Sequence, residues 1–193
     1  MSFLIALDAG HGLSNNKEGV YDPGAVYYDS NFNLTYQEAD LTFYYTSLLG
    51  DLLISAGYEV FQTRASIDAE APLSSRVKLA EISGCDALLS IHLNAFSSES
   101  ASGCEVLYRD YEKDSNLARI ALSGVINAGL KFRSRGIKER SNLAILKSVK
   151  PAALLEIGFI TNDSDRGKIC DLVKARKICE SIVSHFKMFG AEV

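Results

Sequence analysis

Two histidines and a glutamate stand at or near the ends of apolar segments in this sequence. His11 follows the first segment within Asp8–Gly12, and His92 ends a second within Ser90–Ala95. Glu156 interrupts the apolar run Pro151–Phe159. An ionised carboxylate in such a run is costly unless it is paired, hydrogen-bonded or close to a metal. Because two imidazoles and a carboxylate are typical zinc ligands, these residues indicate a catalytic metal site.

The elements that must position these residues can be read from the hydrophobic pattern. Short apolar runs predict strands at Phe3–Leu7, Tyr58–Thr63, Ala87–His92, Glu105–Tyr108, Leu143–Leu146 and Ala152–Ile157. Helical periodicity predicts helices over Tyr36–Ala56, Ser74–Ile82, Ser115–Ala128 and Asp165–Phe189. This alternation predicts an α/β fold with a mostly parallel central sheet of about six strands, covered by helices on both faces. Ligands collect at the carboxyl ends of such strands, where His11 and His92 lie.

A third ligand has to come from elsewhere, and the candidate is Glu38 at the start of the first long helix. Two interpretations compete for it. Thr35 and Glu38 have the spacing of a capping box, in which the glutamate bonds back to the helix N-terminus. Alternatively, Glu38 completes the metal site. The local sequence favours the cap.

The motifs together resemble a known family, the zinc-dependent N-acetylmuramoyl-L-alanine amidases of bacterial cell-wall remodelling enzymes and phage endolysins. The similarity extends from Leu4 to the last helix and reverses the preference at Glu38. The segments that carry it are Asp8–Gly12, Asp22–Ala25, Glu38, Thr63–Arg64 with Leu73 and Arg76, Ser90–Ala95, Arg135–Lys138 and Leu155–Asn162.

The resemblance implies one Zn²⁺ per chain, held by His11, Glu38 and His92, with Glu156 as the catalytic residue that moves the proton of the attacking water. It also implies the bond: the amide between N-acetylmuramic acid and L-alanine in peptidoglycan. Further candidates for orienting the ligands or contacting substrate are Asp8, Asn94, Arg135 and Lys138.

Composition excludes other classes of protein. A net charge of −4 argues against a nucleic-acid partner, and no apolar stretch is long enough for membrane insertion. We expect a monomer with a single catalytic domain over residues 1–193 and no separate wall-binding domain. The start lacks a basic leader, so we expect synthesis in the cytoplasm without a signal peptide, followed by action on the cell wall. The segment Phe96–Gly103 is too short for an inhibitory helix, which predicts an open site.

Two alternatives remain. The first is another zinc hydrolase, a peptidase or deacetylase, which would release products of a different chemistry. The second is a non-catalytic wall-binding relative, against which Glu156 and the three ligand candidates argue.

Overall fold

The computed structural model describes residues 2–189. A six-stranded sheet runs through the centre of the protein in the order β6-β1-β7-β10-β8-β9. Four strands, β6, β1, β7 and β10, are parallel; β8 is antiparallel to β10, and β9 is parallel to β8. The bounds are β1 Leu4–Ala9, β6 Glu59–Gln62, β7 Ala87–Asn94, β8 Cys104–Tyr108, β9 Ser134–Glu139 and β10 Ala152–Phe159. The mostly parallel sheet is confirmed.

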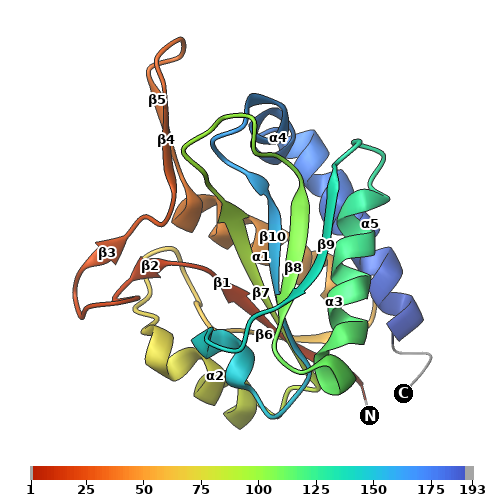
Figure 1. Ribbon diagram of the computed structural model, residues 1–193. Helices are drawn as coiled ribbons and strands as arrows, with labels where there is room; N and C mark the ends of the chain where they lie inside the picture. The colour runs from red at the N-terminus through yellow and green to blue at the C-terminus, as the bar shows by residue number, and fades with distance from the viewer. Residues whose placement is uncertain (1, 190–193) are drawn as a thin grey trace.

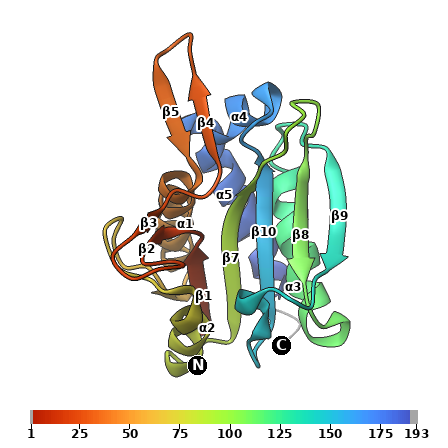
Figure 2. The same ribbon diagram turned by 60° about the vertical axis from the view of Figure 1, so that its left-hand side comes forward.

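Helices cover both faces of this sheet (Figures 1 and 2). The face with the larger hydrophobic core packs against α1 (Glu38–Ser55), α3 (Tyr111–Ile126) and α5 (Leu172–Phe189). The opposite face packs against α2 (Leu73–Ile82) and the short 3₁₀ helix η1 (Ala144–Lys147). Side chains alternate along each strand, so Leu89 and Leu155 enter the larger core, whereas Leu88 and Leu154 enter the smaller one.

Two predicted elements were wrong, and one strand was not predicted. The expected strand Leu143–Leu146 is mostly η1; a short apolar run does not distinguish a strand from a buried helical turn. The sixth strand is instead β9, whose polar composition suits a sheet edge. The expected helix Asp165–Phe189 is two helices, α4 (Asp163–Ile169) and α5, because Asp171 accepts hydrogen bonds from the backbone of Val173 and Lys174 and starts a new helix.

Two small hairpins, which the sequence pattern did not predict, lie between β1 and α1. The first pairs β2 (Gly12–Leu13) with β3 (Tyr21–Asp22), and the second pairs β4 (Val26–Asp29) with β5 (Leu34–Gln37). The β4–β5 hairpin projects from the body as an arm (Figures 1 and 2). Among the described residues, no helix has the length and apolar character needed to cross a membrane.

Candidate metal centre and active site

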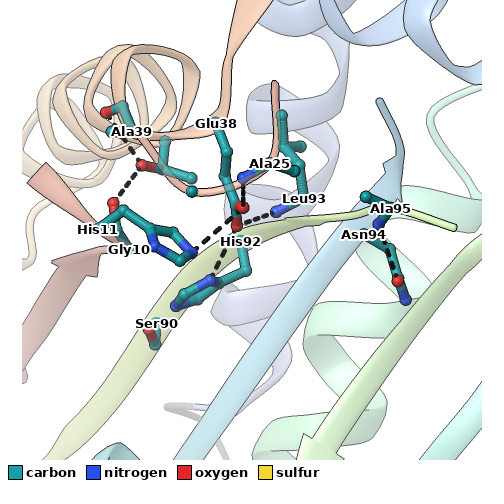
Figure 3. A network of polar contacts seen from close by, with 12 residues as sticks. Gly10, His11, Ala25, Glu38, Ala39, Ser90, His92, Leu93, Asn94 and Ala95 are labelled. Atoms are coloured by element: carbon teal, nitrogen blue, oxygen red, sulfur yellow. Dashed lines mark hydrogen bonds and ion pairs between the residues drawn. The ribbon is translucent and has the colours of Figure 1, made fainter. Parts of the chain in front are cut away.

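The three predicted ligands converge at the carboxyl ends of β1 and β7. His11 follows β1, His92 lies near the end of β7, and Glu38 is the first residue of α1. One ligand atom from each lies within 4.8 Å of the others. Figure 3 shows the Glu38 carboxylate reaching toward both imidazoles. The structure thus brings together three residues that are far apart in the sequence.

Glu38 does not form the capping box that its local sequence suggested. The N-cap of α1 is Gln37, and the cap has no side-chain hydrogen bond. The Glu38 side chain is instead buried, and its two oxygens accept hydrogen bonds from the backbone N–H groups of Ala25 (2.8 Å) and Leu93 (2.9 Å). Burial alone would raise the pKa of Glu38, but His11 and His92 hold it well below its usual range. Glu38 is therefore a fixed anion between two imidazoles.

Each ring nitrogen of His11 contacts a carboxylate. Its Nε2 lies 3.2 Å from Oε2 of Glu38, and its Nδ1 lies 3.0 Å from Oδ2 of Asp22. Burial lowers the pKa of His11, but the hydrogen bonds and charges of Glu38 and Asp22 outweigh burial and raise it to about 9. In the metal-free protein His11 is therefore protonated at neutral pH.

The backbone of His11 adopts a left-handed conformation with φ of 61°, which is unfavourable for a residue with a side chain. Two buried arginines hold it there. Arg76 Nη2 donates to the His11 carbonyl at 2.7 Å, and Arg64 Nη1 donates to the carbonyl of Gly10 at 3.3 Å. Arg76 also pairs with Asp8, at 3.0 Å. The arginines thus fix the loop that presents the first imidazole.

His92 faces Glu38 from β7, with its Nδ1 2.9 Å from Glu38 Oε1. Its ring lies against Gly10, where a Cβ atom would come within 2.4–2.7 Å of three ring atoms. Gly24 plays a similar part: a Cβ there would lie 2.6 Å from Glu38 Oε2 and 2.7 Å from a ring carbon of His11. The two glycines leave the space in which the ligands meet.

Glu156 lies on β10, one strand away from the predicted ligand His92 on β7. It is in register with His92 on β7 and with Glu105 on β8, so the three side chains point to the same face of the sheet. One Glu156 oxygen, Oε2, is buried without a hydrogen-bond partner in the described part of the chain. Burial, aided by the charges of Glu38 and Glu105 and opposed by the histidines, raises the pKa of Glu156 to about 7. A carboxyl group that titrates near neutrality is suited to moving protons.

The remaining predicted residues lie around this centre with other partners. Asp8 accepts hydrogen bonds from Thr63, Ser90 and Arg76 at the end of β1. Asn94 donates to Glu105 at 3.3 Å, and Figure 3 shows its side chain turned away from the imidazoles. Arg135 and Lys138 both donate to Glu105, each at 2.6 Å.

Two residues of the site were missed. Asp22 belongs to a motif that carries the family resemblance, but the motif does not reveal that it contacts His11 directly. The sequence pattern places Glu105 in a strand but does not reveal that it bonds to Asn94, Arg135 and Lys138 beside Glu156. A polar residue at an inward-facing position of an apolar strand was the available signal for Glu105. The signal for Asp22 was weaker, because its role depends on a hairpin that the pattern did not reveal.

A pocket of about 210 Å³ opens beside the two imidazoles. Asp8, Arg76, Asn15 and Asn16 supply its polar wall. Its apolar wall comes from α2, β10 and the η1 segment, and comprises Leu73, Leu143, Ala144, Ile145 and Leu154. A substrate held at the histidines therefore has an apolar recess next to it, on the β1–β7 side of Glu156.

Comparison with known proteins identifies the family. The family described as N-acetylmuramoyl-L-alanine amidase matches residues 5–186. The chain is 30% identical over 185 residues to the uncharacterized protein YqiI of Bacillus subtilis, covering 93% of this chain and 81% of that protein. It is 31% identical over 185 residues to the probable cell wall amidase LytH of Staphylococcus epidermidis, covering 96% of this chain but 57% of LytH.

The solved structures agree. The N-acetylmuramoyl-L-alanine amidase from Clostridium difficile 630 superposes with a TM-score of 0.81 and 30% identity, covering 98% of this chain and 97% of that one. The chain belongs to the N-acetylmuramoyl-L-alanine amidase family. It is accordingly an amidase, a hydrolase of the bond between N-acetylmuramic acid and L-alanine, as the resemblance implied.

Proposed function

We propose that this chain cleaves the muramoyl–alanine amide of peptidoglycan as a zinc enzyme, with the metal held by His11, Glu38 and His92. The observation that carries the proposal is the convergence of these three residues beside Glu156, a half-buried residue whose Oε2 is buried and has no hydrogen-bond partner among the described residues. The donor set fits the metal, because two imidazole nitrogens and a carboxylate oxygen are a common ligand set of catalytic zinc. When bound, Zn²⁺ supplies Lewis acidity that polarises the substrate carbonyl and activates water.

Glu156 moves the proton in this proposal. In its ionised form it accepts a proton from the attacking water, and it then donates that proton to the nitrogen of the departing L-alanine. In the metal-free protein the pKa of Glu156 is about 7, so the group is neither a very weak base nor a very strong acid, which suits it to both steps.

The surrounding residues orient this machinery. Asp22 fixes the ring of His11, so that Nε2 faces Glu38. Asp8 neutralises buried Arg76, which in turn holds the His11 loop. We assign Asn94 to substrate contact, because its side chain lies toward Glu105 rather than toward the ligands.

The substrate is peptidoglycan, and the place of action is the cell wall. LytH, a relative over nearly the whole of this chain, is named a probable cell wall amidase. We further propose that the chain works as a monomeric catalytic domain, needing no bound nucleic acid and no insertion into a membrane.

The decisive experiment combines product analysis with metal analysis. Purified peptidoglycan is digested with the protein, and the fragments are identified by mass spectrometry. We expect stem peptides with a free L-alanine amine, together with glycan chains whose lactyl groups end in a carboxylate. Cleavage within the stem peptide, or loss of acetate from the sugars, would instead establish the peptidase or deacetylase alternative.

The metal assignment is tested on the same preparation. His92→Ala is expected to lose zinc and activity together, whereas His185→Ala is expected to keep both. His185 lies on α5 and bonds to Asn127 and to the Ser181 carbonyl, far from the site in sequence and fold. Near-stoichiometric zinc in the His92 variant would remove that residue from the ligand set.

A further inference from the structure

Arg135 and Lys138 both form ion pairs with the carboxylate of Glu105, next to Glu156. Oε2 of Glu105 receives both Nε of Arg135 and Nζ of Lys138, each at 2.6 Å. Glu105 is buried, whereas the side chains of Arg135 and Lys138 are 29% and 33% exposed. Burial would raise the pKa of Glu105, but the two cations lower it, so it is a fixed anion. Glu105 therefore acts as an anchor, and the cations present their remaining donors to solvent.

This arrangement carries a net positive charge with unused hydrogen-bonding capacity. Two cations face one anion, so one positive charge is uncompensated within the cluster. Within residues 2–189, the hydrogen bonds of Arg135 use only its Nε, and its guanidinium lies over the Phe159 ring at 5.0 Å. The paired terminal nitrogens of an arginine are suited to binding a carboxylate bidentately. Stacking on Phe159 fixes the plane in which they are offered.

The cluster lies at a defined position relative to the scissile bond. Glu105 is in register with Glu156, and neighbouring strands are roughly 5 Å apart. Arg135 and Lys138 come from β9, one strand further from the metal ligands. This spacing corresponds to roughly one to three residues of extended peptide at about 3.5 Å each. A charged group bound here would thus belong to a substrate residue close to the bond that is cut.

The two sides of Glu156 differ in chemistry. On the β1–β7 side lies the partly apolar pocket beside the imidazoles, and on the β8–β9 side lie Arg135 and Lys138. A muramoyl amide has the same asymmetry. The lactyl carboxyl of the glycan is consumed in the scissile amide and carries no charge, whereas the stem peptide carries free carboxylates.

We propose that Arg135 and Lys138 form a carboxylate-binding subsite that selects an acidic residue next to the alanine of the stem peptide. In peptidoglycan this is the α-carboxylate of the γ-linked D-glutamyl residue. The subsite rests on the proposed function and adds to it a direction: the peptide crosses β8 and β9, and the muramoyl group lies over the pocket at β1 and β7. Bacteria that amidate this carboxylate would then supply a poorer substrate.

The test uses two soluble substrates that differ in one group. They are N-acetylmuramoyl-L-alanyl-γ-D-glutamyl-L-lysine and the same compound with the glutamyl α-carboxylate converted to a carboxamide. We expect the wild-type protein to prefer the acid by about tenfold in kcat/KM, the ratio that about 1.4 kcal/mol produces. In Arg135→Gln and Lys138→Gln we expect this ratio to fall to about two or three.

The ratio separates recognition from general damage. Each single substitution leaves Glu105 one cationic partner, and any effect transmitted to Glu156 slows both substrates alike. Arg133→Gln is the matched control, because it removes the same charge from an exposed side chain just before β9 and should keep the ratio at its wild-type value. A second readout is the affinity of each compound for Glu156→Gln protein, in which the acid should again bind about tenfold more tightly.

The outcomes distinguish the two proposals. If wild-type protein cleaves both substrates equally well, or if neither substitution lowers the ratio, the subsite is wrong while the amidase function stands. If wild-type protein cleaves neither substrate and also releases no alanine-terminated peptides from peptidoglycan, the proposed function fails and the subsite fails with it.

Discussion

Oδ2 of Asp22 lies 3.0 Å from Nδ1 of His11, on the side of the ring opposite to Glu38. The same oxygen accepts hydrogen bonds from the side chains of Asn15 and Asn16, at 2.7 and 2.8 Å. The Asp22 carboxylate is therefore itself held in place. The β2–β3 hairpin, which looks peripheral in Figure 1, in this way sets the orientation of a proposed metal ligand.

Asp22→Asn is expected to weaken zinc binding by roughly 10–100-fold, the usual cost of removing a partner that orients a ligand. Competition with a chelator near pH 9 measures this, because proton competition at His11 is then small. Asp51→Asn, an exposed change on α1, is the control. Unaltered zinc affinity in the Asp22 variant would show that the contact does not support the metal.

Zinc affinity should rise with pH. The metal-free protein holds His11 protonated with a pKa of about 9, and zinc requires the neutral imidazole. Binding therefore expels a proton, and the apparent affinity should increase about tenfold per pH unit between roughly pH 7 and 9. Glu38 stays ionised over this range because its pKa is held low. Chelator titrations at several pH values provide the measurement; a flat profile would mean that His11 is not a ligand.

Glu156→Gln should retain zinc and lose activity by roughly 10²–10⁴-fold, because the amide keeps the shape of the side chain but cannot accept the proton. Metal content and the rate of peptidoglycan release are measured on one preparation. Substantial activity in this variant would contradict the assigned role.

The same substitution should stabilise the metal-free protein above neutral pH. The pKa of Glu156 is raised by folding, so its contribution to stability is full below the unfolded value of about 4.5 and is lost as pH rises through about 7. Glutamine has no such dependence. At about pH 8 we expect the free energy of unfolding of Glu156→Gln to exceed that of the wild type by about 1–3 kcal/mol. Urea unfolding in the presence of a chelator tests this. Equal free energies of unfolding for the variant and the wild type at about pH 8 would refute it.

Two glycines with nearly equal backbone angles allow a matched comparison. Gly24 and Gly19 have φ of +66° and +68°, so alanine strains both backbones alike. A Cβ at Gly24 meets Glu38 and His11, whereas at Gly19 nothing lies within 4 Å. We expect Gly19→Ala to lose about 1 kcal/mol of stability and Gly24→Ala to lose more because of the added clash, and only Gly24→Ala to lose zinc and activity. Full zinc occupancy in Gly24→Ala would show that the ligands can move apart.

The sequence predicted the parts of the site that depend on strand ends. His11, His92 and Glu156 each follow or interrupt an apolar run, and parallel strands bring such positions to one edge. Glu38 could not be assigned in this way. Its local pattern is that of a cap, and its actual partners, Ala25 and Leu93, are distant in sequence, so only resemblance to a family indicated its role.

The elements that were missed share a physical cause. β9 is an edge strand whose residues Ser134–Glu139 are polar and interrupted by a glycine, so it lacks the alternation of a half-buried strand. The segment Leu143–Leu146 is apolar because it packs on α2 and β10, not because it pairs with another strand. Burial was predicted correctly there, and backbone geometry was not.

The arm formed by β4 and β5 leaves the body and returns to it at a closed junction. Ala25 and Glu38, at the two ends of the arm, exchange backbone and side-chain hydrogen bonds of 2.8 Å. The turn at residues 30–33, which includes Phe32 with 76% of its surface exposed, lies beyond this junction. The tip is thus a natural insertion point: evolution or an engineer can lengthen it, shorten it or graft a glycan-reading loop there while the ligand geometry stays unchanged.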